Sequence, residues 1–86
     1  MIIRLDKSFR KQVEHLKPAQ QKRLRQALKL FLQEPLHPDL SSHGVTGRWK
    51  GHRSIAFGGD WRAHYKLVGE DVALFVAVGT HNQLYN

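Results

Sequence analysis

A glycine pair at positions 58 and 59, followed by Asp60, is the feature that most constrains how this chain can fold. Apolar residues recur at alternate positions on both sides of it, over residues 48–57 and 61–68. Glycine adopts the positive φ angles of tight hairpin turns, and a hydrophobic period of two is typical of strands. The pattern therefore predicts two antiparallel strands joined by a turn at Gly58-Gly59-Asp60.

Alternation assigns the side chains of this predicted hairpin to two faces of a sheet. The odd positions form a largely apolar face that two helices could cover: Trp49, Ile55, Phe57, Trp61, Ala63, Tyr65 and Leu67. The even positions form a polar face: Arg48, Lys50, His52, Ser54, Asp60, Arg62, His64 and Lys66. We expect the first face to build the core and the second to meet something negatively charged.

The first third of the chain predicts a strand and two helices. Residues 2–5 are apolar, and Asp6 is a good N-cap because its carboxylate can accept backbone N–H groups. Apolar residues then recur at helical spacing to Leu16, and again from Pro18 until Pro35 ends the pattern. The polar faces of these helices carry eight cations: Lys7, Arg10, Lys11, Lys17, Lys22, Arg23, Arg25 and Lys29.

The second half adds a loop and a further strand. Residues 35–47 are rich in Pro, Ser and Gly, which indicates a loop, and residues 72–79 form an apolar strand suited to a central position. We therefore predict an α+β domain spanning residues 1–86. An N-terminal strand and a two-helix hairpin would precede an antiparallel three-stranded run that completes a small four-stranded sheet, followed by a short C-terminal tail.

Composition narrows the environment and the partners. With 86 residues the chain has room for one domain, and without cysteine it has neither disulfides nor thiolate metal ligands. No signal peptide or membrane-spanning run is evident, so we expect a cytoplasmic protein that does not enter membranes. Fourteen Lys and Arg against seven Asp and Glu give a formal charge of +7, which favours a polyanion or an acidic protein as partner.

Histidines border the predicted polar face. His43 precedes the sheet and His81 follows its last strand, while His52 and His64 lie on the face itself. Histidine exchanges protons near neutral pH, and RNA can be cleaved without a metal when its 2′-hydroxyl is the nucleophile. Such a reaction needs a base, an acid and cations that stabilise the phosphorane. The spacing of the histidines gives little support for a metal site, and we expect no cofactor.

Three segments, HGVTGRWKGHR, GGDWRAHYK and VGTHNQLYN, resemble the YafQ branch of the RelE/ParE toxin superfamily. The resemblance covers the whole chain in element order and is most specific in the patterns H-x3-G-x-WKG-x-R, D-W and G-T-H. It implies a bacterial toxin that is a ribosome-dependent endonuclease. Such a toxin cuts mRNA in the A site without a metal, leaves a 5′-hydroxyl, and is neutralised by an acidic antitoxin protein.

The resemblance also implies catalytic positions. His43, Asp60 and His81 match the YafQ pattern, and Arg62 matches a basic residue of the RelE branch that stabilises the scissile phosphate. We expect His81 to be the general acid and either Asp60 or His43 to be the general base. The same resemblance implies residues that bind RNA. Lys50 and His52 match basic positions of the RelE branch, Arg53 completes the WKG-x-R pattern, and Tyr85 falls at a functional aromatic that is usually Phe.

One position departs from the pattern. The YafQ branch has a further histidine late in the first hairpin strand, where this chain has Ala56. Either Arg62 and His52 compensate for the missing histidine, or catalysis is weak. Two alternatives therefore accompany the nuclease: a ParE-type toxin that inhibits gyrase without cutting nucleic acid, and a weakened homologue that only binds RNA and antitoxin.

Overall fold

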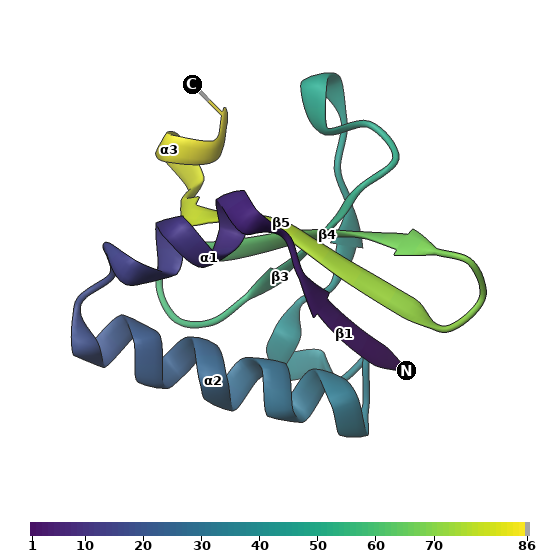
Figure 1. The fold of residues 1–86 in the computed structure, drawn as a ribbon, viewed down its shortest axis with the longest axis horizontal. Helices are drawn as coiled ribbons and strands as arrows, with labels where there is room; N and C mark the ends of the chain where they lie inside the picture. Colours follow the sequence, from purple (N-terminus) through teal and green to yellow (C-terminus); the bar gives the residue numbers. More distant parts are fainter. Residues whose placement is uncertain (86) are drawn as a thin grey trace.

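The computed structural model describes residues 1–85. Its strands and helices are β1 (Ile2–Leu5), α1 (Lys7–Glu14), α2 (Pro18–Gln33), β2 (His43–Gly44), β3 (Arg53–Ala56), β4 (Trp61–Val68), β5 (Val72–Thr80) and α3 (His81–Tyr85), with short 3-10 turns η1 (Pro38–Leu40) and η2 (Gly47–Trp49). Figure 1 shows the sheet between α2 on one side and α3 with the η2 loop on the other.

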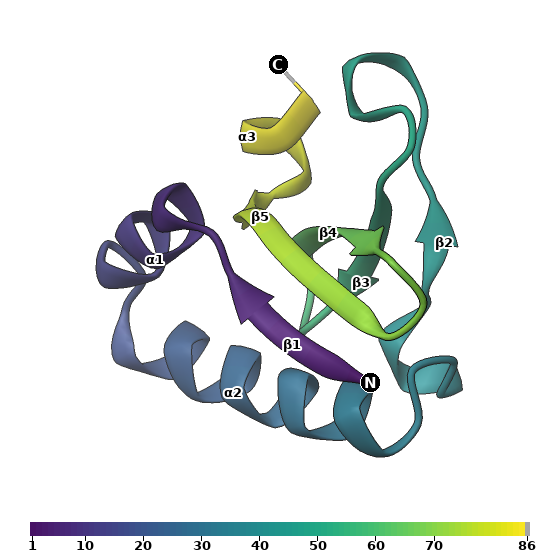
Figure 2. The same ribbon diagram turned by 45° about the vertical axis from the view of Figure 1, so that its right-hand side comes forward.

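The strands form one mixed sheet in the order β1-β5-β4-β3-β2. β1 runs parallel to β5, while the other neighbouring strands are antiparallel, as the turned view in Figure 2 makes clear. The predicted central position of β5 is confirmed. The predicted four-stranded sheet is wrong by one strand, because His43 and Gly44, expected in a loop, pair with β3 and add β2.

The two predicted helices begin where the sequence predicts, but α1 ends at Glu14, two residues before the end of its predicted pattern at Leu16. The Asp6 side chain accepts a hydrogen bond from the backbone N–H of Ser8 and caps α1. Pro18 occupies the first turn of α2, and the helix ends at Gln33, just before Pro35. Local capping and proline signals therefore determine the limits of the helical layer.

An aromatic cluster joins the helices to the sheet. The Phe31 ring of α2 lies 4.9 Å from Tyr65 and 5.4 Å from Phe75, measured between ring centroids, and Phe9 of α1 lies 5.7 Å from Phe75. Ile55, Phe57, Ala63 and Tyr65 of the predicted core face are all buried, and Trp61 packs partly buried against them. The prediction of the core face is confirmed for these residues.

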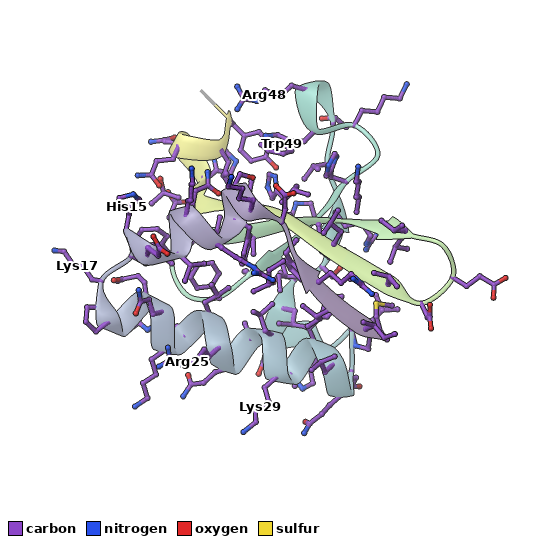
Figure 3. The ribbon with its side chains drawn as sticks, viewed as in Figure 1. His15, Lys17, Arg25, Lys29, Arg48 and Trp49 are labelled. Carbon is purple, nitrogen blue, oxygen red and sulfur yellow. The ribbon has the colours of Figure 1, made fainter. Side chains whose placement is uncertain are left out.

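The first strand of the hairpin is shorter than predicted. Residues 48–52 lie in η2 and the turn after it, and only Arg53–Ala56 form a strand. Gly47 and Gly51 adopt φ angles of +66° and +87°, which no extended strand contains. Alternation therefore stops before residue 53, and Trp49, expected in the core, lies on the opposite side of the sheet from α2 (Figure 3).

Two further predictions at the periphery need correction. Leu67, expected in the core, is 53% exposed because the end of the β4–β5 hairpin extends beyond the helical layer, as Figure 1 shows. The predicted C-terminal tail is a short helix, α3, as far as Tyr85. Within residues 1–85 there is no helix that is both long and apolar enough to cross a membrane.

Candidate active site

The C-terminal helix α3 is anchored so that His81 is its first residue. The backbone N–H of Thr80 donates to Gln83 Oε1 (2.9 Å), and the N–H of Gln83 donates to Thr80 Oγ1 (3.2 Å). This reciprocal pair is a capping box, in which a side chain at each end satisfies a free backbone donor of the first turn. The N–H of His81 donates to the carbonyl of Asp60 (2.9 Å), so α3 starts beside the hairpin turn.

The polar face of the sheet holds a buried histidine, His64. In the ladder it lies opposite Ser54 on one side and Ala77 on the other. His64 is 0% exposed and Ser54 is 1% exposed, although the sequence predicts an open face here. Burial arises because two aromatic side chains, Trp49 and Tyr85, cover His64 from above.

Trp49 connects the η2 loop to α3. Its indole N–H donates to the carbonyl of Leu84 (2.8 Å), and its ring lies 4.7 Å from that of His64 and 5.4 Å from that of His52. Figure 3 shows the side chain directed from the η2 loop towards α3. A tryptophan expected in the core is thus a bridge between two segments that are far apart in the sequence.

Three further histidines lie near enough to His64 to act on it electrostatically, and we call the four residues the imidazole cluster: His43, His52, His64 and His81. Burial, together with smaller electrostatic effects of His52, His43 and His81, lowers the pKa of His64 to about 4 from an ordinary 6.5. His64 is therefore uncharged at neutral pH. The other three members come from β2, from the turn before β3 and from the start of α3.

Tyr85 lies against two members of the imidazole cluster. Its ring centroid is 4.5 Å from that of His81 and 5.5 Å from that of His64, and its hydroxyl lies 3.3 Å from His64 Nε2. Burial raises the pKa of the Tyr85 hydroxyl, and the nearby Arg62 charge partly offsets this effect. These contacts place Tyr85 beside His64 and His81, and its predicted role in binding RNA stays a prediction.

Arg62 occupies the next position on the same face of β4. It lies opposite Ala56 and Gly79 in the ladder, and its guanidinium donates to the carbonyls of Gly59 (2.8 Å) and Trp61 (2.9 Å). Gly79 leaves space for the capping box, because a Cβ there would lie 2.8 Å from Gln83 Oε1. The glycine of the G-T-H pattern thus allows α3 to pack on the sheet.

The structure brings some predicted site residues together and leaves others apart. His43, His52, His81, Arg62 and Tyr85 all lie near enough to influence one another or His64. The Asp60 side chain is exposed on the turn next to His81, and Lys50 is exposed at the end of η2.

Arg53 lies on the other face of β3. Its position alternates with that of Ser54, and its guanidinium donates to Ser42 Oγ (3.2 Å). It is therefore separated by the sheet from His64 and from the side chains that cover it.

Sequence reasoning missed the parts that assemble this site. His64 was assigned only to an open polar face and Trp49 to the core, and no local signal reveals a contact between residues 35 positions apart in the chain. The capping box did have a signal, the spacing T-x-x-Q at Thr80 and Gln83. That pattern indicates a helix start at His81, where a tail was predicted.

The positive charge of the molecule is largely unpaired. Within residues 1–85 the only ion pairs within 4.0 Å join His37 to Glu34 and Asp39, so no lysine or arginine has a carboxylate partner. The same residues contain no group of three or more His, Asp or Glu side chains placed to hold a metal ion. This excess of unpaired positive charge makes the surface of the domain suited to an anionic partner.

The family model for the bacterial toxin of type II toxin–antitoxin systems, YafQ, matches residues 1–86. The chain belongs to this family. It is a toxin of a type II toxin–antitoxin system, as the resemblance of its three motifs predicts, and the imidazole cluster with Tyr85 is the candidate active site of this YafQ-family toxin. A comparison with curated protein sequences finds no match.

Solved structures of similar toxins agree with the fold. YafQ from E. coli strain BL21(DE3) is 25% identical with a TM-score of 0.75, and the match covers 98% of this chain and 97% of that chain. YafQ in the E. coli DinJ–YafQ toxin–antitoxin complex is 28% identical with a TM-score of 0.67, covering 98% and 96%. A copper-bound mutant toxin from Helicobacter pylori is 27% identical with a TM-score of 0.67, covering 99% of both chains.

A more distant similarity shows the fold alone. RelE in a RelB–RelE complex from Methanococcus jannaschii is 18% identical, with a TM-score of 0.73 over 94% of this chain and 93% of that chain. The YafQ-family toxin therefore has a RelE-like α+β fold.

Proposed function

We propose that this YafQ-family toxin is a ribosome-dependent mRNA endonuclease that cuts by metal-independent acid–base chemistry. The observation that supports the proposal is that the rings of His81 and Tyr85 lie against each other on one face of the sheet, with Arg62 near Tyr85 and His43 near His64. Proton-transferring imidazoles, a fixed cation and an aromatic ring are the groups that cleavage through a 2′-hydroxyl requires.

The proposed reaction is an in-line displacement at phosphorus. Asp60 or His43 takes the proton of the 2′-hydroxyl as its oxygen bonds to phosphorus, and the bond from phosphorus to the 5′-oxygen breaks. His81 gives a proton to that leaving oxygen, so the products carry a 2′,3′-cyclic phosphate and a 5′-hydroxyl. Arg62 and Lys50 stabilise the negative charge of the phosphorane, and Tyr85 stacks on a base.

Arg62 is well placed for that role. Two carbonyl hydrogen bonds hold its guanidinium on the polar face, so little reorganisation is needed when charge develops. The position opposite Arg62 is Ala56, where no proton can be exchanged. In this proposal the acid and base therefore come from the borders of the face, from His43 on one side and from Asp60 and His81 on the other.

The proposed partner is an acidic antitoxin. The E. coli relative is present in a toxin–antitoxin complex with DinJ. In this chain no lysine or arginine of residues 1–85 is neutralised by a carboxylate of its own, which supports binding of an acidic segment. The eight basic residues of α1, α2 and the turn between them are candidates for that contact, and Figure 3 shows Lys17, Arg25 and Lys29 directed away from the sheet.

The test is controlled expression with mapping of mRNA ends on ribosomes. We expect new 5′-hydroxyl ends within translated messages, and a loss of about 10²–10⁴ in cleavage rate for His81→Ala. The matched control is His15→Ala, an exposed histidine at the end of α1 that lies outside the imidazole cluster. Antitoxin binding should survive in both variants.

Three results would contradict the proposal. Normal cleavage of mRNA by the His81→Ala variant would show that His81 is not the general acid. A DNA-damage response without cleaved mRNA would favour a ParE-type gyrase inhibitor instead, and intact mRNA with retained RNA and antitoxin binding would favour the weakened homologue.

A further inference from the structure

His64 is a polar side chain in an apolar enclosure. It is 0% exposed, and the Trp49 ring meets it edge-on at 84° with 4.7 Å between centroids. The Tyr85 ring lies at 62° with 5.5 Å between centroids. Burying an imidazole in such surroundings costs free energy unless it makes a compensating interaction, so the contacts of its two nitrogens indicate its role.

One nitrogen of His64 has a partner and the other has none. Nε2 lies 3.3 Å from the Tyr85 hydroxyl, while Nδ1 has no hydrogen-bond partner within residues 1–85. A neutral imidazole has one nitrogen that only accepts, and a phenol is a good donor. The Tyr85 O–H can therefore donate to Nε2 as long as His64 stays uncharged.

The surroundings keep His64 uncharged. The titratable groups around it are His43 on β2, His52 before β3, and His81 and Tyr85 on α3, and none of them is a carboxylate. His52, His43 and His81 each disfavour a positive charge on His64. A protonated His64 would lose its acceptor, and the Tyr85 hydroxyl would lose its partner.

The same hydrogen bond determines where the Tyr85 ring lies. Its hydroxyl end is held by His64, and its ring rests against His81 at 4.5 Å between centroids. The preceding residue, Leu84, is held through its carbonyl by Trp49. His64 and Trp49 together therefore fix the last described turn of α3 against the sheet.

We propose that His64 is a positioning residue, whose uncharged Nε2 accepts the Tyr85 hydroxyl and so holds the Tyr85 ring beside His81. His64 itself is too deeply buried to touch RNA, and it acts through Tyr85. The inference rests on the proposed nuclease function, because the position of Tyr85 matters only where an RNA base must be held. The hydroxyl of Tyr85 therefore has a role in this chain that phenylalanine, which has no hydroxyl, could not fill.

The first experiment is a double-mutant cycle of His64→Leu and Tyr85→Phe, measured as kcat/KM for cleavage of ribosome-bound mRNA. Each single change removes one side of the hydrogen bond, and we expect a loss of about 3- to 10-fold for either. The kcat/KM of the double variant should be no lower than that of the more impaired single variant, because both changes remove the same hydrogen bond. His64→Gln, which can present an acceptor, should recover part of the loss. Full additivity, or normal activity of His64→Leu, overturns the proposal.

The second experiment needs no enzymatic activity. Nitrogen NMR of the wild-type protein should show His64 Nε2 as an unprotonated acceptor at pH 7, and Tyr85→Phe should shift that resonance. A protonated Nε2 at pH 7, or no response to Tyr85→Phe, overturns the proposal. Absence of mRNA cleavage by the wild-type protein overturns the proposed function and the role of His64 with it. Cleavage without coupling between the two positions overturns the role of His64 alone.

Discussion

Two neighbouring residues on one face of the sheet have very different environments. Arg62 and His64 are two positions apart on β4, yet Arg62 is half-buried and bonded to carbonyls while His64 is sealed from water. The difference arises because Trp49 and Tyr85 cover only one of them. The charged Arg62 therefore stays within reach of solvent, while the uncharged His64 lies beneath the two rings.

Burial of His64 makes the stability of the toxin depend on pH. Its pKa is about 4 in the folded protein and near 6.5 when exposed, so the unfolded chain binds more protons between these values. Acidification from pH 6.5 to pH 4 should therefore lower the free energy of unfolding, by up to about 3 kcal/mol. Denaturant titrations across this range, on the wild type and on His64→Leu, measure the effect.

The His64→Leu variant should lose this dependence, because leucine binds no proton. Asp6 does not interfere, since its pKa is lowered from 3.8 by hydrogen bonds from Ser8 and its contribution is lost only when the pH falls through that lower value. An unchanged slope in His64→Leu would show that another group causes the loss.

At the scale of elements, the start of α3 controls the candidate site. The helix spans only His81–Tyr85, and isolated helices of this length do not form in water. It persists because the capping box of Thr80 and Gln83 satisfies its first turn and Trp49 binds its last one. Both His81 and Tyr85 depend on this short helix for their positions.

Removal of the capping box should therefore loosen α3 without unfolding the domain. Gln83→Ala is expected to cost about 0.5–2 kcal/mol of local stability, which is typical of a lost helix cap. Hydrogen exchange of the α3 amides should become faster and mRNA cleavage slower. Asn82→Ala, an exposed change in the same helix, is the matched control. Equal exchange rates in the two variants would mean that the cap does not hold α3.

At the scale of the whole molecule, unpaired positive charge dominates. The formal charge is +7, and the lysines and arginines of residues 1–85 lack carboxylate partners. The charge lies both on the helices, where Figure 3 shows Arg25 and Lys29 on the outer side of α2, and on the face of the candidate site. Two surfaces are thus available for anionic partners, one on each side of the sheet.

The salt dependence of RNA affinity can show which of the two surfaces binds RNA. Affinity for a short single-stranded RNA should fall as salt rises, because phosphate contacts release counterions. Lys50→Gln combined with Arg62→Gln should reduce the slope of log affinity against log salt by about 1.4, since each phosphate contact contributes about 0.7. Arg25→Gln combined with Lys29→Gln, on the other surface, should leave the slope unchanged. A reduced slope in the α2 variant alone would place the RNA on the helices.

The fold was largely predictable from neighbouring residues. The N-cap at Asp6, the proline at position 18 and the strand pattern of residues 61–68 act within a few positions of the chain, and the structure confirms the cap, the helix start and the bounds of the strand. The strand at residues 48–57 was predicted too long because Gly51 takes a positive φ angle inside it and Gly47 takes one just before it. Alternation describes a strand only while the backbone stays extended.

The sequence by itself determined the helical layer, the hairpin, the core face and the excess of positive charge, because these follow from local periodicity, capping and composition. Only the tertiary structure decided that His64 is buried, that Trp49 binds Leu84, and that Tyr85 meets His64 and His81. These contacts join β4, the η2 loop and α3, which lie far apart along the chain. Their geometry depends on how the whole sheet is assembled, and no local pattern contains that information.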